Sequence, residues 1–115
     1  MKDYNIEDAQ RILKTCNPNE INMVNHVLDK WFNRGYNFAY IFDCLLNKIP
    51  LAIIKTKENR FKIIYPHETI KSQDLYIIIE IDDDKKVLII TVYSFDKRRR
   101  EHEKERKWKF IWSDL

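Results

Sequence analysis

His26, Lys30 and Arg34 stand four residues apart along one stretch of the chain. In a helix this spacing places side chains along one face. An imidazole titrates near neutral pH and can accept or donate a proton, while two nearby cations can hold a phosphate. The alternative is a solvated helix flank, in which His26 caps or packs locally and both cations face water.

A tyrosine and two basic residues lie on β-rich segments further along the chain. Tyr93 follows an Ile/Val-rich run and could donate a hydrogen bond or stack on a nucleic-acid base, although a strand tyrosine more often serves packing. Arg60 and Lys62 alternate with Phe61 and Ile63, so they are predicted on the opposite face of a strand. These basic residues are candidate RNA contacts.

The positive charge of the chain is concentrated near its C-terminus. The net charge is +3, but residues 96–109 hold eight Lys and Arg against four Asp and Glu, which leaves the rest of the chain at −1. The run holds four consecutive cations, Lys97, Arg98, Arg99 and Arg100. Its arginines suit two-pronged phosphate contacts, and the whole run predicts an anionic partner. The glutamates at positions 101, 103 and 105 also fit a plain solvated helix or a docking surface for a protein.

The composition disfavours cofactor chemistry and membrane insertion. A single glycine, Gly35, does not allow a glycine-rich phosphate loop, and no histidine or cysteine spacing suggests zinc, so we expect neither cofactor nor metal. The two cysteines, Cys16 and Cys44, are expected as reduced core thiols. The chain has no signal-peptide stretch and no apolar run near the roughly 18 residues of a membrane span, which predicts a cytoplasmic protein.

Three helices are expected before Pro50. Apolar residues recur at helical spacing in three stretches, at residues 6–16, 17–34 and 38–47. The second stretch has the clearest start signal, because Asn17 can cap a helix, Pro18 suits its first position and Glu20 follows at the third. The apolar stripe of this second helix would begin with Ile21.

After Pro50 the hydrophobic period changes to two, which is typical of strands. Four Ile/Val-rich runs predict a four-stranded antiparallel sheet, at residues 51–55, 60–65, 75–81 and 87–95. Alternating aromatics at residues 108–112 could add a last edge strand. With 115 residues, the chain fits a single α+β domain: three N-terminal helices, the antiparallel sheet and a charged segment at 96–115.

The order of these features resembles a known class of proteins. The segment from His26 to Gly35 is similar to a His-x-x-x-Arg-x-x-x-Arg-Gly motif, with Lys30 where that motif usually has arginine. A helix, the strand runs, the sequence Thr91-Val92-Tyr93 and the basic run then follow as in RelE-like and BrnT-like toxins and a short prokaryotic family related to them. The resemblance covers residues 24–104, and the helix at residues 4–16 has no counterpart in it.

The resemblance implies a RelE-like fold and metal-independent RNA cleavage, in which a ribose 2′-hydroxyl attacks the adjacent phosphate. His26 would then be the base or acid, Lys30 and Arg34 would stabilise the phosphate charge, and Tyr93 would assist. We expect these four residues to line one groove together with a basic residue of the second strand, for which the candidates are Arg60 and Lys62.

RNA is the partner that the resemblance implies, with ribosome association left open, and such a toxin is normally held inactive by a cognate antitoxin. Two alternatives remain at this point. The chain could be a non-catalytic RNA- or protein-binding module of the same fold, or a purely structural interaction protein that uses its basic segment to dock an acidic partner.

Overall fold

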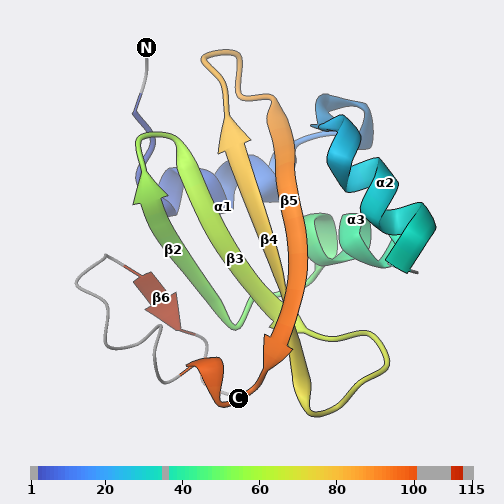
Figure 1. Cartoon of the computed structure of the whole chain (residues 1–115). Coiled ribbons are helices and arrows are strands. Elements are labelled where there is room, and N and C mark those ends of the chain that lie inside the picture. The colour runs from blue at the N-terminus through green and yellow to red at the C-terminus, as the bar shows by residue number, and fades with distance from the viewer. Residues whose placement is uncertain (1–2, 35–36, 101–109, 113–115) are drawn as a thin grey trace.

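The computed structural model describes residues 3–34, 37–100 and 110–112, with the side chains of residues 30–34 and 110–112 left out of the description. These residues form one mixed sheet and three α-helices (Figure 1). In chain order the elements are α1 (Ile6–Thr15), the 3₁₀ turn η1 (Pro18–Glu20), β1 (Ile21–Met23), α2 (Asn25–Arg34), α3 (Phe38–Asn47), β2 (Ala52–Lys57), β3 (Arg60–Pro66), β4 (Gln73–Ile81), β5 (Val87–Asp96) and β6 (Phe110–Trp112).

The sheet has a core on one side and a second, smaller apolar cluster on the other. Its strand order is β1-β5-β4-β3-β2-β6. Helices α1 and α3 cover one face, and α2 lies beside β5 (Figure 1). Alternate residues of β3 and β4, such as Phe61, Ile63 and Ile77, are buried under α1 and α3. We call the opposite side the outer face; its buried cluster contains Ile54, Ile64 and Tyr76 among others.

The expectation of a four-stranded antiparallel sheet is wrong, although the α+β class and the three helices are found. The four expected strands are β2 to β5, and they pair in antiparallel fashion. The sheet gains β1, which runs parallel to β5, at one edge and β6, antiparallel to β2, at the other. The sheet is therefore mixed and has six strands.

The error lies in the helix expected to begin at Asn17. The predicted capping box forms, and the backbone N–H of Asn17 donates to Glu20 Oε1 at 2.8 Å. It closes only one 3₁₀ turn, because the next three residues alternate as a strand does, with Ile21 buried and Asn22 exposed. Ile21 pairs with Val87 of β5, and burial beside that strand outweighs the local helix signal. Helix α2 then begins at Asn25.

A β-bulge in β5 determines which of its side chains reach the outer face. Ile78 of β4 pairs with Thr91, while the next residue, Ile79, pairs with Ile89, so one extra residue, Ile90, is inserted in β5. Such an insertion shifts the alternation of side chains by one position. As a result, Ile89 and Val92 both contribute to the core under the helices, and Tyr93 lies on the outer face opposite Tyr76.

We predict that Ile77→Ala destabilises the fold by about 2–5 kcal/mol, because Ile77 is fully buried and its truncation leaves a cavity between sheet and helices. The matched control is Ile49→Ala, which removes the same atoms from a side chain that is 78% exposed and should cost less than about 0.5 kcal/mol. Urea denaturation measures both values. Equal losses would contradict the core described here.

Candidate functional site

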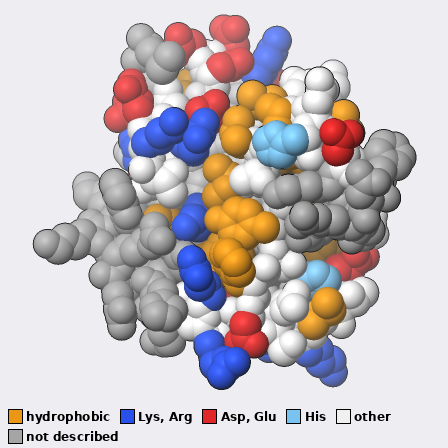
Figure 2. Space-filling view, viewed as in Figure 1, with side chains coloured by type: hydrophobic (Ala, Val, Ile, Leu, Met, Phe, Trp, Pro, Cys, Tyr) orange, Lys and Arg blue, Asp and Glu red, His pale blue; other side chains and the backbone are white. Residues whose placement is uncertain are grey.

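Three aromatic rings form a continuous cluster on the outer face. Tyr76 of β4 stacks against Tyr93 of β5, with ring centroids 5.3 Å apart and an interplanar angle of 25°. Phe95 meets Tyr93 at 5.0 Å and Tyr76 at 5.3 Å, edge to face in both cases. Tyr76 is buried beneath, while Tyr93 and Phe95 are half-buried. Figure 2 shows hydrophobic side chains gathered in a stripe along the middle of this face.

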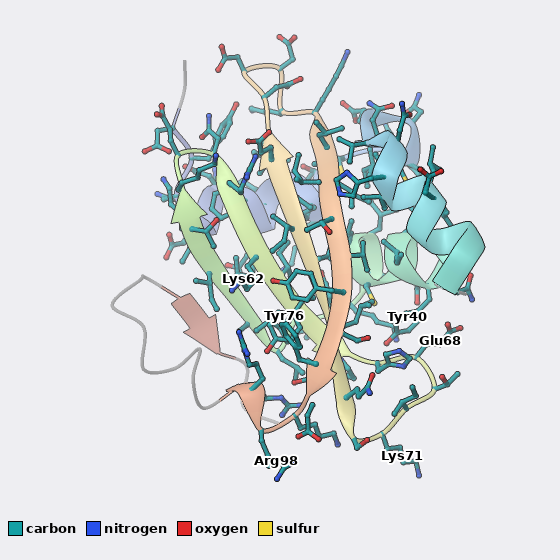
Figure 3. The ribbon with its side chains drawn as sticks, viewed as in Figure 1. Tyr40, Lys62, Glu68, Lys71, Tyr76 and Arg98 are labelled. Carbon is teal, nitrogen blue, oxygen red and sulfur yellow. The ribbon has the colours of Figure 1, made fainter. Side chains whose placement is uncertain are left out.

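Two cations contact the rings of this cluster. Lys62 of β3 places Nζ 6.0 Å from the Tyr76 ring centroid, and the two side chains lie side by side in the middle of the face (Figure 3). The guanidinium carbon of Arg99 lies 4.5 Å from the Phe95 centroid. Arg99 stays exposed, whereas Lys62 is only 8% exposed. Cation–π attraction of this kind orders a cation without neutralising it, so the charge of Arg99 remains accessible to an anion.

Other predicted RNA contacts are already paired with carboxylates. Arg60 donates from Nε and Nη2 to Glu80 Oε1, at 3.1 and 2.7 Å. Arg98 donates from Nε to Asp96 Oδ1 at 3.1 Å, and its side chain is 92% exposed. The pKa of Asp96 is lowered, first by the backbone N–H of Arg98 and then by its side chain. An RNA phosphate would therefore compete with these carboxylates for both arginines.

Arg100 makes the most buried of these ion pairs. Its Nε donates to Asp74 Oδ2 at 2.5 Å and its Nη2 donates to Asp74 Oδ1 at 2.6 Å. The Asp74 side chain is fully buried and that of Arg100 is 28% exposed. The hydrogen bonds to Asp74 raise the pKa of Arg100. Each oxygen of the Asp74 carboxylate accepts one hydrogen bond from the Arg100 guanidinium, which is the strongest arginine–carboxylate geometry.

Residues 97–100, which we call the basic turn, follow β5 directly, with a turn at residues 97–98 that leads into helical backbone at residues 99–100. Asp96 Oδ1 accepts from the backbone N–H of Arg98 at 2.9 Å, in the manner of a helix cap. The backbone N–H of Lys97 donates to Ser72 O at 2.9 Å, and that of Arg100 donates to Lys97 O at 3.1 Å. The turn is thus attached to the loop before β4 as well as to β5.

The predicted catalytic residues lie on two elements. His26 is an exposed residue in the first turn of α2, which packs beside β5. Lys30 and Arg34 belong to the same helix, and their side chains lie outside the described part of the structure. Tyr93 lies on the outer face with Lys62. The structure therefore brings the strand residues and the basic turn onto one face, and a groove shared with His26 stays a prediction.

Sequence reasoning missed three residues of this face. Phe95 lies two positions after Tyr93, and Tyr76 lies between the buried residues Leu75 and Ile77 of β4, so strand alternation combined with the aromatic type could have indicated both. Asp74 gave no such signal. Its partner Arg100 is 26 residues away, and only the folded sheet brings the two together.

A cavity of about 360 Å³ lies between the start of α3 and the β3–β4 loop, where Leu75 and Ser94 of the sheet also line it. Tyr40 Oη donates to Pro66 O at 2.5 Å, and Asn37 Nδ2 donates to Glu68 Oε1 at 2.9 Å. His67 Nδ1 accepts from the backbone N–H groups of residues 69 and 70. Tyr40 and Glu68 are labelled in Figure 3. These bonds hold the loop to the helix, and the cavity contains none of the predicted site residues.

Comparisons of the chain with protein-family models, with curated proteins and with solved structures found no significant match. None of the helices formed by the described residues has the length and apolar character needed to cross a membrane. Within those same residues, no group of three or more His, Cys, Asp or Glu side chains is arranged to hold a metal ion.

We predict an alkaline loss of stability that depends on Cys44, which lies buried beneath Tyr40. Burial raises the pKa of the Cys44 thiol to about 11. An unfolded thiol ionises near pH 8.5. The contribution of Cys44 is therefore fully present below about pH 8.5 and is lost as the pH rises to about 11, with a slope of up to roughly 1.4 kcal/mol per pH unit.

Denaturant unfolding at a series of alkaline pH values measures this effect. Cys44→Ala should make the decline in the free energy of unfolding shallower than in the wild type. Cys16→Ala is the comparison: burial raises the pKa of this thiol too, but Cys16 is only half-buried, so its removal should change the decline less than Cys44→Ala does. A decline in Cys44→Ala as steep as in the wild type would contradict the assignment.

Proposed function

We propose that this chain binds single-stranded RNA on the outer face of its sheet and acts as a metal-independent, RNA-cleaving, toxin-like protein. The observation that carries the proposal is the aromatic cluster with Arg99 stacked on one of its rings. Aromatic rings beside exposed cations are what single-stranded nucleic acids bind, because every base offers a π-face and every linkage a phosphate. Paired bases keep their faces stacked within the duplex, so a single strand fits this surface better.

The charges of the face fit such a strand at one end. Arg99 and Lys97 are exposed at the basic turn, next to Phe95. At the opposite end of β5, the turn after β4 carries Asp82, Asp83 and Asp84. RNA phosphates would be attracted to the basic turn and repelled from the aspartates. Tyr93 and Phe95, which lie nearest the basic turn, are therefore the rings on which we place the bases.

Cleavage is the further step of the proposal and rests on His26. This residue is exposed near the start of α2, beside the strand that carries Tyr93. A neutral imidazole can take the proton of a 2′-hydroxyl, whose oxygen then bonds to the adjacent phosphorus while the bond from phosphorus to the 5′-oxygen of the next nucleotide breaks. The cations of the face can stabilise the charge that develops on the phosphoryl oxygens, and the leaving 5′-oxygen takes up a proton from solvent. The resemblance to RelE-like and BrnT-like toxins supports this assignment. The same resemblance supports a second proposal, that a cognate antitoxin is the protein partner of this chain. The free thiols Cys16 and Cys44 suit a cytoplasmic location.

The alternative is a module of the same architecture that binds RNA or protein without cleaving it. The carboxylates paired with Arg60, Arg98 and Arg100 favour this alternative, because they neutralise part of the basic surface. RNA binding and RNA cleavage therefore have to be measured separately.

We predict that Tyr93→Ala weakens binding of a short single-stranded RNA by about 5- to 150-fold, the loss expected when one base loses its stacking partner. Tyr93→Phe is the matched control and should bind within about twofold of the wild type, because it keeps the ring. Fluorescence anisotropy with a labelled oligonucleotide measures both, with duplex RNA as the weaker competitor. Equal affinities for wild type and Tyr93→Ala would contradict binding on this face.

We predict that expression of the wild type in a bacterial host degrades cellular RNA and slows growth, and that His26→Ala abolishes both effects. The physical reason is the loss of the only group placed to take the 2′-hydroxyl proton in this proposal. Gel analysis of RNA over time is the measurement, with Ile49→Ala, a change at an exposed side chain outside the proposed site, as the folded control. Intact RNA and equal growth with both proteins would remove the catalytic claim and leave the binding claim standing.

A further inference from the structure

Asp74 is a buried carboxylate that neither binding nor cleavage uses directly. It occupies the second position of β4, between Pro66 of β3 and Phe95 of β5 in the strand register. Its side chain is fully shielded from solvent. A carboxylate in such a place is costly unless a cation and further hydrogen bonds satisfy it. Asp74 therefore needs a cationic partner that stays bound, and that partner is Arg100.

The geometry of the pair fixes the orientation of the basic turn. Arg100 approaches Asp74 with two parallel N–H donors, so its guanidinium plane is set as well as its position. The other end of the turn is tied by the Lys97 N–H to Ser72 O. Residues between two such attachments have little freedom to move. Arg99 lies between them.

The position of Arg99 follows from these attachments. Its guanidinium lies over Phe95, and Phe95 is the cross-strand neighbour of Asp74. We infer that Asp74 is a positioning residue of the outer face: through Arg100 it holds the basic turn so that Arg99 stays stacked on Phe95 and exposed to an anion. Arg100 itself donates to both oxygens of Asp74, so in this inference it holds the basic turn while Arg99 faces the anion. A phosphate contact of Arg100, expected from the sequence, stays a prediction.

The effect on RNA rests on the proposed function, whereas the anchoring of Arg99 does not. Two measurements distinguish the effect on RNA affinity from the anchoring of Arg99. The first needs no RNA. Protons of the Arg99 side chain that lie over the Phe95 ring should resonate upfield in the NMR spectrum because of the ring current. Asp74→Asn should abolish that shift, because an amide offers one acceptor oxygen and turns an NH₂ group toward the guanidinium donors.

The matched control is Glu80→Gln. It makes the same chemical change in a carboxylate that also accepts from an arginine of the outer face, Arg60, but it lies at the other end of the sheet from the basic turn. The Arg99 shift should survive in Glu80→Gln. If Asp74→Asn does not fold, Arg100→Lys provides the same test, since it keeps the charge at a partly exposed site and loses the two-pronged geometry. It too should abolish the shift.

The second measurement is the salt dependence of RNA affinity. Arg99→Ala should reduce the slope of log affinity against log salt by about 0.7, the value for one lost single-strand phosphate contact. Asp74→Asn combined with Arg100→Gln removes the pair without leaving an unpaired cation at Arg100, so it should reduce the slope by the same amount. Adding Arg99→Ala to these two changes should cause no further loss. In the Glu80→Gln background, Arg99→Ala should still cause its full loss.

An Arg99 shift that persists in Asp74→Asn, or in Arg100→Lys where the first variant does not fold, overturns the inference. A further loss of slope when Arg99→Ala is added to Asp74→Asn and Arg100→Gln overturns it as well. Absence of RNA binding by the wild type overturns the proposed function, and the ring-current shift then decides the anchoring role alone.

Discussion

The outer face depends on one extra residue in β5. Side chains alternate strictly along a strand, so a strand that supplies Ile89 to the core would, without an insertion, also direct Tyr93 toward the helices. The bulge at Ile90 resets the alternation halfway along the strand. The first half of β5 keeps Val87 and Ile89 in the core under the helices, and the second half turns Tyr93 and Phe95 outward to meet Tyr76.

The sequence predicted the elements whose signals are local. The strands from β2 to β5 have strong β-branched runs, and α1 and α3 have helical apolar stripes with capping asparagines, so the α+β class was predictable. Strand β1 was not. Its three residues follow a helix start signal, and only pairing with residues 87–89 makes a strand more favourable there. Local signals compete poorly with burial beside a strand that lies far along the chain.

Some features of the candidate site could also be predicted from local sequence, and others could not. Strand alternation placed Lys62 on the same side of β3 as Arg60, away from Phe61, as the structure has it. What the sequence could not reveal is the pairing of charges, because the carboxylates of Asp74 and Glu80 meet their arginines only across the folded sheet. A run of four cations therefore contains residues with different roles. Arg98 and Arg100 form ion pairs with carboxylates, and Arg99 stacks on an aromatic ring.

The parallel pairing of β1 with β5 also has a consequence for how the chain reaches its native state. Residue 21 can find its partner at residue 87 only after nearly the whole sheet has been synthesised. Contacts between such distant segments form slowly, because the intervening chain must first be ordered. During translation, β2, β3 and β4 can pair as local hairpins, while the segment with β1 and α2 waits for β5. Helix α2 also packs beside β5, so the helix that carries His26 cannot dock on this strand before residues 87–96 have been synthesised.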